Sequence, residues 1–182
     1  MSVNTIDLIT EAFDRHEIKY RVVETETLAF VDAGYNIQGG PTVRFHFFGQ
    51  GEKGNDVQMR ITGLMNKVAA EKRVPILEAC NRINSEMRFL KFYLDKEGTL
   101  FGQADLPQNI GEDCVGECCF ELFIRSMQIL DQRYRLFPEA YYSEPAADRN
   151  GRLRDTLNAL KNLSENPLTI TIEDKEPDPP AH

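Results

Sequence analysis

The sequence of 182 residues contains no tryptophan and no apolar run long enough to cross a membrane. A membrane-spanning helix needs about 20 consecutive apolar residues, so none is predicted. Residues 1–5 have neither the basic region nor the apolar stretch of a secretory signal. We therefore expect a cytoplasmic protein without a membrane partner.

Basic residues are also in short supply. Lysine and arginine total 21 against 29 acidic residues, which gives a net charge of −8. Affinity for nucleic acids depends on basic groups that neutralise phosphates, so a mildly acidic chain is not expected to bind DNA or RNA. Hydrophobic residues make up 41% of the sequence, which is enough for a folded core.

Cysteines number only four, and in the cytoplasm we expect them to be reduced. Cys114, Cys118 and Cys119 lie on one predicted helix, whereas a structural zinc site needs four converging ligands. With ~3.6 residues per turn, the adjacent Cys118 and Cys119 point about 100° apart. Packing of these cysteines and of Cys80 in the core is the favoured interpretation, with a redox-sensitive thiol or a metal ligand as alternatives.

Groups that could carry out catalysis are scattered. His16, His46 and His182 lie far apart, and none stands beside a cysteine or serine in the arrangement that activates a nucleophile. The glycine-containing segment 49–54 joins two predicted strands and does not open a helix, as a phosphate-binding loop would. We expect no enzymatic activity, no cofactor and no metal.

The apolar pattern changes its period along the chain. A helix is predicted near residues 5–17, and alternating polarity predicts short strands at 20–24, 28–31, 42–48 and 56–65. A helix from Pro75, a β-hairpin, and a long helix from Glu112 to about Leu136 follow, the last ended by Phe137 and Pro138. The predicted fold is α+β, an antiparallel sheet flanked by helices.

This α+β domain is predicted to occupy residues 1–145. Leucines at helical spacing predict a C-terminal helical extension within residues 146–172. Residues 173–182 are acidic and rich in proline, and we expect a disordered tail there.

The predicted hairpin allows its register to be worked out. If Gly98 takes the left-handed position of a three-residue turn, Leu94 lies opposite Leu100 and Phe92 lies opposite Gly102 on one apolar face. A slip of one residue would turn every side chain to the other face, so the slipped register is disfavoured. Tyr93 then pairs with Phe101 on the second face.

Five residues near this hairpin are candidates for binding a partner. Phe89, Tyr93 and Phe101 share the second face, where they form either a second core layer beneath the long helix or an exposed aromatic interface. Asn81 and Asn84, on the preceding helix, either tie that helix to nearby backbone by hydrogen bonds or take part in recognition.

The helix and hairpin together resemble the central signature of the YbjN family, which is similar in fold to type III secretion chaperones. The residues that carry the resemblance are Leu77-Glu78-Ala79-Cys80-Asn81-Arg82-Ile83-Asn84, Arg88-Phe89, Lys91, Asp95, Gly98 and Ala104-Asp105-Leu106. It is specific over about residues 75–107, and the order of elements extends it to about residues 5–140. Ile83 departs from the pattern, because such sequences often have an aromatic residue there.

The resemblance implies the order α-β-β-β-α-β-β-α, no catalytic, cofactor or metal residues, and a chaperone-like or regulatory role in which another protein is bound. It also implies a homodimer, because the related chaperones are usually dimers and two-fold pairs are the commonest oligomers. A regulator that holds a small molecule between the sheet and the long C-terminal helix is the second hypothesis.

Overall fold

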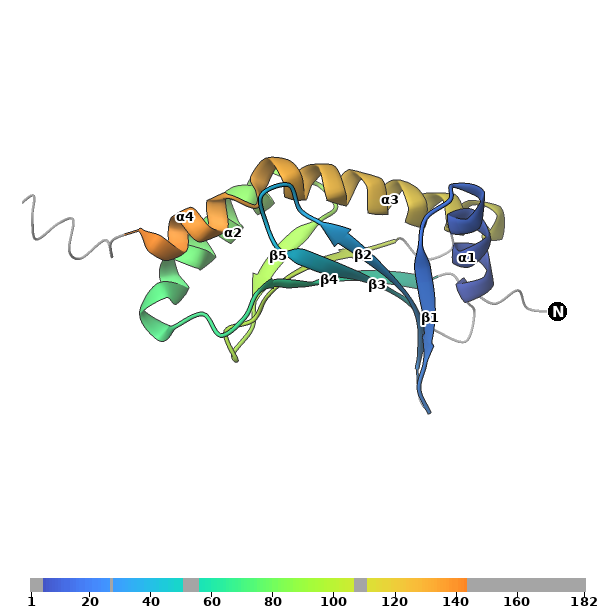
Figure 1. Ribbon diagram of the computed structural model, residues 1–182, viewed down its shortest axis with the longest axis horizontal. Helices are drawn as coiled ribbons and strands as arrows, with labels where there is room; N and C mark the ends of the chain where they lie inside the picture. The colour runs from blue at the N-terminus through green and yellow to red at the C-terminus, as the bar shows by residue number, and fades with distance from the viewer. Residues whose placement is uncertain (1–4, 27, 51–55, 107–110, 144–182) are drawn as a thin grey trace, which may run out of the picture. The chain divides into compact units, whose positions relative to one another are not determined.

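The computed structural model describes residues 5–26, 28–50, 56–106 and 111–143 (Figure 1). In these residues one antiparallel sheet of six strands has the order β1-β2-β3-β4-β6-β5. The strands are β1 (Tyr20–Glu24), β2 (Ala29–Asn36), β3 (Thr42–Gln50), β4 (Asp56–Met65), β5 (Lys91–Leu94) and β6 (Leu100–Asp105). The α+β class and the predicted order of elements are confirmed, and the four strands before the second α-helix correspond to the four that alternating polarity predicts.

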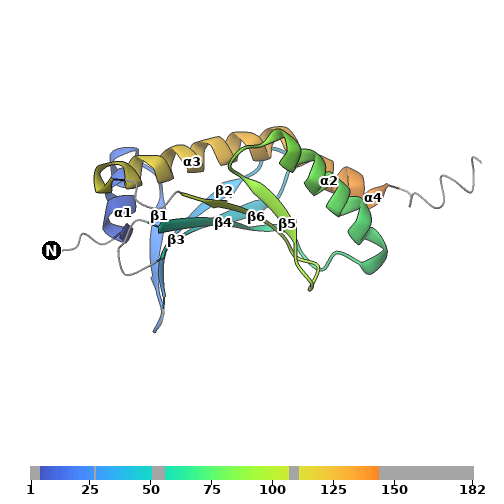
Figure 2. The same cartoon turned by 180° about the vertical axis from the view of Figure 1, so that it is seen from behind.

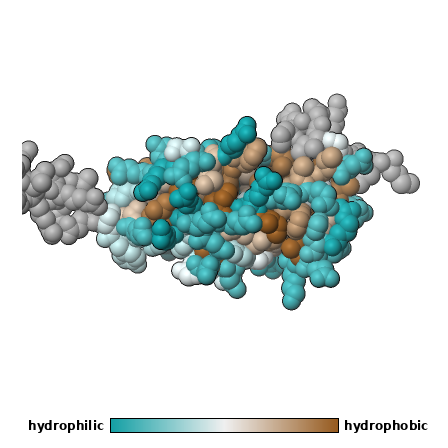
Figure 3. Space-filling view, turned by 90° about the horizontal axis from the view of Figure 1, so that it is seen from above, coloured by the Kyte–Doolittle hydropathy of each residue, from teal (hydrophilic) through white to brown (hydrophobic). Residues whose placement is uncertain are grey.

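The helices lie on one side of this sheet (Figures 1 and 2). They are α1 (Thr5–Arg15), the short 3-10 helix η1 (Ala70–Lys72), α2 (Arg73–Glu86), α3 (Glu112–Arg133) and α4 (Leu136–Tyr142). The long α3 runs over the sheet, with α1 packed against it at one end and α2 and α4 together at the other (Figure 1). None of the helices within the described residues has the length and apolar character needed to span a bilayer. Seen from above, where α3 lies in Figure 1, the surface mixes hydrophilic and hydrophobic residues (Figure 3).

The chain divides into two units, residues 1–143 and 144–182. The predicted helical extension over residues 146–172 and the predicted tail over residues 173–182 fall in the second unit, outside the described residues.

Alternation along the central strands separates the two faces of the sheet. Phe45 and Phe47 on β3 and Met59 and Ile61 on β4 are fully buried against the helices. Aromatic rings join the layers, since the Phe45 ring centroid lies 4.8 Å from that of Phe123 on α3. The intervening residues point to the opposite face, as the period of two predicts.

The hairpin of β5 and β6 has the predicted register. Phe92 pairs with Gly102, Tyr93 with Phe101, and Leu94 with Leu100. Gly98 has a φ of +84°, the left-handed conformation that the three-residue turn requires.

The prediction that Phe137 and Pro138 end the long helix is wrong. α3 ends at Arg133, and these two residues lie in the first turn of α4. Proline is tolerated there because the first N–H groups of a helix have no intrahelical partner. Phe137 is fully buried and its ring centroid lies 5.3 Å from that of Phe92, so α4 contributes to the core beside the hairpin.

Candidate functional site

The sheet face that points away from the helices, called the open face below, is covered by none of the described helices (Figures 1 and 2). Cross-strand pairing aligns one polar row of side chains over all six strands of this face. From β1 to β5, the row consists of Arg21, Asp32, His46, Arg60, Gln103 and Lys91. Aromatic residues lie on both sides of this row: Phe30 and Phe48 on one side, and Tyr93 and Phe101 on the other.

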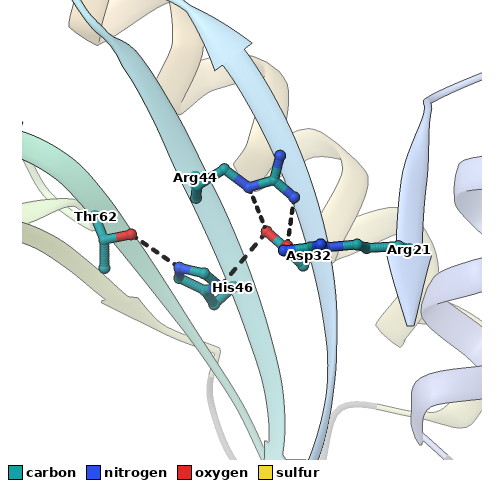
Figure 4. Close-up of polar contacts among 5 residues, drawn as sticks. All are labelled: Arg21, Asp32, Arg44, His46 and Thr62. Carbon is teal, nitrogen blue, oxygen red and sulfur yellow. Dashed lines mark hydrogen bonds and ion pairs between the residues drawn. The ribbon is translucent and has the colours of Figure 1, made fainter. Parts of the chain in front are cut away.

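Asp32 is a buried member of the polar row, with only 1% of its side chain exposed, and it lies between Arg21 and Arg44 (Figure 4). Arg21 donates from Nε to Oδ2 at 2.6 Å, and Arg44 donates from Nε to Oδ1 at 2.8 Å. A terminal nitrogen of Arg44 also donates to Oδ2. Both carboxylate oxygens are therefore occupied by arginines from the two neighbouring strands.

The protonation states of this cluster follow from burial and charge. Burial raises the pKa of Asp32, but the hydrogen bonds from Arg44 and Arg21 lower it by more, so that this pKa lies below its ordinary value. Burial lowers the pKa of His46, and the nearby Asp32 offsets this only in part. At neutral pH Asp32 is thus ionised and His46 is neutral, with His46 Nε2 2.9 Å from Thr62 Oγ1.

Two of the three predicted aromatic residues come together on the open face. The rings of Tyr93 and Phe101 stack with centroids 5.5 Å apart, and Tyr93 is 45% exposed. The guanidinium carbon of Arg60 lies 4.6 Å from the centroid of the Phe101 ring. The long helix α3 covers the opposite face, so it does not bury this pair as a second core layer (Figure 1).

Phe89 is separate from this pair, contrary to the prediction that it shares their strand face. It lies in the connection between α2 and β5, because the strand begins only at Lys91. Its side chain is 60% exposed and borders a pocket of about 280 Å³ against α3. The buried hydroxyl of Ser126, which has no hydrogen-bond partner among the described residues, also lines this pocket.

Asn84 ties α2 to the edge strand β5. Its amide nitrogen donates to the Phe92 carbonyl at 2.9 Å, and its amide oxygen accepts from the Phe92 N–H at 2.7 Å. The Asn84 side chain therefore satisfies the outward N–H and C=O of Phe92 as a neighbouring strand would. This confirms the prediction of a hydrogen-bonding role for Asn84, whereas Asn81 is exposed on α2.

The helix–hairpin signature thus has a structural explanation, and the sequence model of the YbjN family, described as "Putative bacterial sensory transduction regulator", matches residues 5–113. The chain belongs to the YbjN family. The match extends from α1 to the first two residues of α3 and includes all six described strands. No curated protein matches the chain.

Lys91 is a second residue of the YbjN signature whose role the structure explains. Its Nζ donates to the carbonyl of Asn84 at 2.7 Å and to that of Met87 at the end of α2. A cation at this position satisfies carbonyl groups that lack an intrahelical partner. Signature residues Asn84 and Lys91 therefore position the helix against the hairpin.

At the other edge of the sheet, none of the described residues covers the outer strand in this way. The Thr25 N–H donates to the Leu28 carbonyl at 2.8 Å, which fixes the alternation of hydrogen-bonded pairs between β1 and β2. By this alternation the N–H and C=O of Val22 point away from β2. Val22 is 42% exposed, so β1 offers an open strand edge.

The cysteines of this YbjN-family chain do not converge. Cys80 and Cys119 are buried, as the core interpretation predicts, while Cys114 is exposed. Burial raises the pKa of Cys80 to about 11 and also raises that of Cys119, so both are neutral thiols. No cluster of three or more potential metal ligands occurs within the described residues.

A ligand layer between the sheet and the long helix was the basis of the small-molecule hypothesis. Near the middle of α3 this layer is filled by rings, because Phe123 lies within 5.6 Å of Phe13 and 4.8 Å of Phe45, measured between centroids. The pocket beside Phe89 lies elsewhere, between α3 and the α2–β5 connection. The small-molecule hypothesis stays a prediction, and the pocket beside Phe89 is where such a ligand would bind.

Sequence reasoning did not select the Asp32 cluster. Its only local signals are a single acid in the otherwise apolar run around Asp32, and the alternation that puts Arg44 and His46 on one face of β3. The cluster forms only when β1, β2 and β3 pair in their observed registers.

Proposed function

We propose that this YbjN-family chain is a cytoplasmic, non-enzymatic regulatory module that holds a segment of another protein on its open face. The observation that carries the proposal is the stacked, partly exposed pair of Tyr93 and Phe101 beside Arg60, on a sheet face without a described covering helix. Exposed aromatic and arginine side chains are the groups that dominate binding energy in protein interfaces.

The chemistry of the polar row supports binding and gives no support to catalysis. Asp32 accepts hydrogen bonds from arginines at both oxygens, so neither oxygen is free to take a proton from a substrate. His46 has one ring nitrogen on Thr62 and the other buried, which leaves it no exposed nitrogen toward a reactant.

The substitution Tyr93→Asp tests this surface. It places a charge in the middle of the aromatic pair, and we expect it to abolish recovery of the partner from a lysate, because desolvating a carboxylate there is costly. Tyr142→Asp is the matched control, since Tyr142 is 81% exposed on α4. Recovered proteins are identified by mass spectrometry, and each is then titrated in purified form against the three chains.

The expected pattern is a partner that binds the wild type and Tyr142→Asp but not Tyr93→Asp. Equal thermal midpoints of the three chains exclude unfolding as the cause. If the wild type and Tyr93→Asp recover the same proteins, the open face is not the binding surface.

A homodimer forms part of the proposal, and the β1 edge is the place we propose for it. Two copies related by a two-fold axis can pair their β1 strands antiparallel across Val22, which joins the two sheets. The opposite edge is less suited, because Asn84 already occupies the outward groups of Phe92.

Val22→Pro tests the dimer without disturbing the β1–β2 ladder. The substitution removes an N–H that points away from β2, and proline is tolerated on edge strands. Light scattering at micromolar concentration should give twice 20.8 kDa for the wild type and 20.8 kDa for Val22→Pro. Val23→Pro is the contrasting control, because it removes an N–H of the ladder and should lower the thermal midpoint. A monomeric wild type contradicts the dimer.

A further inference from the structure

The polar row, together with the adjacent Arg44, carries a small surplus of positive charge on an acidic protein. Arg21 and Arg44 face the single buried acid Asp32, which leaves one positive charge at this end of the open face. Arg60, which is exposed above Phe101, adds a second, while Lys91 at the β5 end of the row offsets the exposed Asp105 that lies beside Gln103 on the same face. The chain as a whole has a net charge of −8, so this local surplus has the opposite sign to the rest of the protein.

Asp32 holds the two arginines in fixed orientations with donors to spare. Arg21 uses only its Nε on Asp32, so no described residue pairs with its terminal nitrogens. Arg44 uses Nε and one terminal nitrogen, and its other terminal nitrogen lies beside Gly34. A Cβ on Gly34 would be 3.0 Å from that nitrogen, so glycine leaves it room.

Such arginine pairs match carboxylates. The two terminal nitrogens of Arg21 form a planar fork that can bind a carboxylate at two points, and Arg44 keeps one terminal nitrogen for a single hydrogen bond. Donors that are already oriented lose little entropy on binding. The flanking rings supply apolar contacts on both sides of the row, with the Phe30 and Phe48 centroids 5.0 Å apart on one side. The open face therefore presents both charge and apolar area.

Resting on the proposed function, we infer that the bound segment is an acidic peptide, whose Asp or Glu carboxylates meet Arg21, Arg44 and Arg60 while an apolar side chain packs on Tyr93 and Phe101. Single-stranded RNA also favours arginines and aromatic rings on a sheet. An extended nucleic acid, however, brings a phosphate at every nucleotide to a chain of net charge −8, whereas a peptide needs only a few carboxylates.

Fluorescence anisotropy on the full chain tests this inference. Six strands about 4.8 Å apart span roughly 24 Å, which a labelled extended peptide of about ten residues covers. Three synthetic peptides share a central Phe and alternate Val with Glu, Gln or Lys, and an oligouridine of similar length is the fourth probe. We expect the Glu peptide to bind roughly tenfold or more tightly than the Gln peptide, and salt to weaken it, because charged hydrogen bonds are worth that much.

The double variant Arg21→Gln, Arg60→Gln should lose about tenfold in affinity for the Glu peptide. It leaves Arg44 on Asp32, so the buried carboxylate keeps a partner. Arg125→Gln with Arg135→Gln is the control of equal net charge, because these exposed arginines belong to α3 and to the residue before α4. The control should bind the Glu peptide like the wild type.

Each other outcome overturns the inference. Equal binding of the Glu and Gln peptides, or no binding of the Glu peptide, shows that the open face does not recognise carboxylates. The proposed function would still stand if the lysate experiment recovers a partner that is lost only in Tyr93→Asp. Tight binding of the oligouridine that is lost in the Arg21, Arg60 double variant assigns the open face to nucleic acid.

Discussion

Replacing Arg44 by alanine should lower the free energy of unfolding by about 2 kcal/mol, because it removes hydrogen bonds to the buried, ionised carboxylate of Asp32 while Arg44 itself is 39% exposed. Asp32 is 1% exposed in the presence of Arg44, so water can replace the lost hydrogen bonds only in part. Arg21 still donates to it, which keeps the cost from being larger. Urea unfolding at neutral pH measures the difference in the free energy of unfolding. An unchanged m-value, the slope of that free energy against urea concentration, shows that the same surface is exposed on unfolding.

Asp32→Asn should cost less than Arg44→Ala, although it removes the centre of the cluster. The side chains of Arg21 and Arg44 are 69% and 39% exposed, so both can turn to solvent when the carboxylate is gone. The asymmetry follows from burial, since an unpaired buried charge costs more than an unpaired exposed one. Equal losses for the two variants would contradict it.

The two variants should also differ from the wild type in their response to acid. The folded-state pKa of Asp32 lies below the ordinary 3.8, so the cluster stabilises the wild type above that value and this contribution is lost as pH falls through the folded pKa. Asp32→Asn lacks this component of acid sensitivity. In Arg44→Ala, protonation removes the poorly compensated charge, so its stability deficit relative to the wild type should shrink as the pH is lowered.

Features that depend on neighbours in sequence could be predicted from the sequence. The hairpin register needs only the turn at Gly98 and the apolar pairs Phe92–Gly102 and Leu94–Leu100, all within about a dozen residues. The inward and outward faces of β3 and β4 follow from strict alternation in the same way.

Features that depend on how separate elements meet, whether near or far in sequence, could not. Arg44 reaches Asp32 only because β2 and β3 pair with Ala33 opposite Phe45, and the intervening turn does not fix that register by itself. Phe89 follows α2 by too few residues to join the strand, which alternation alone does not reveal. The break before α4 depends on burying Phe137 beside Phe92, a contact that is remote in sequence.

Gly116 is another residue whose role depends on how two elements meet. Its replacement is expected to have the second large effect on the free energy of unfolding. A glycine in the first turns of α3 would ordinarily be expected only to weaken the helix. In the structure it is buried where α1 crosses α3, and a Cβ added to it would lie 2.3 Å from the Leu8 carbonyl oxygen and 2.9 Å from the Ala12 Cβ. The absence of a side chain therefore lets the two helices touch.

Gly116→Val should lower the free energy of unfolding by about 3 kcal/mol, because the two backbones must separate and the cost of overpacking outweighs the small gain in helix propensity. Gln128→Val is the control on the same helix at an exposed position, where only the propensity of valine is felt. Urea unfolding of both variants gives the comparison, and a difference below about 1 kcal/mol would mean that α1 yields without cost. Because the crossing lies on the helix side of the sheet, the folded fraction of Gly116→Val should still bind the acidic peptide, which separates damage to the scaffold from damage to the open face.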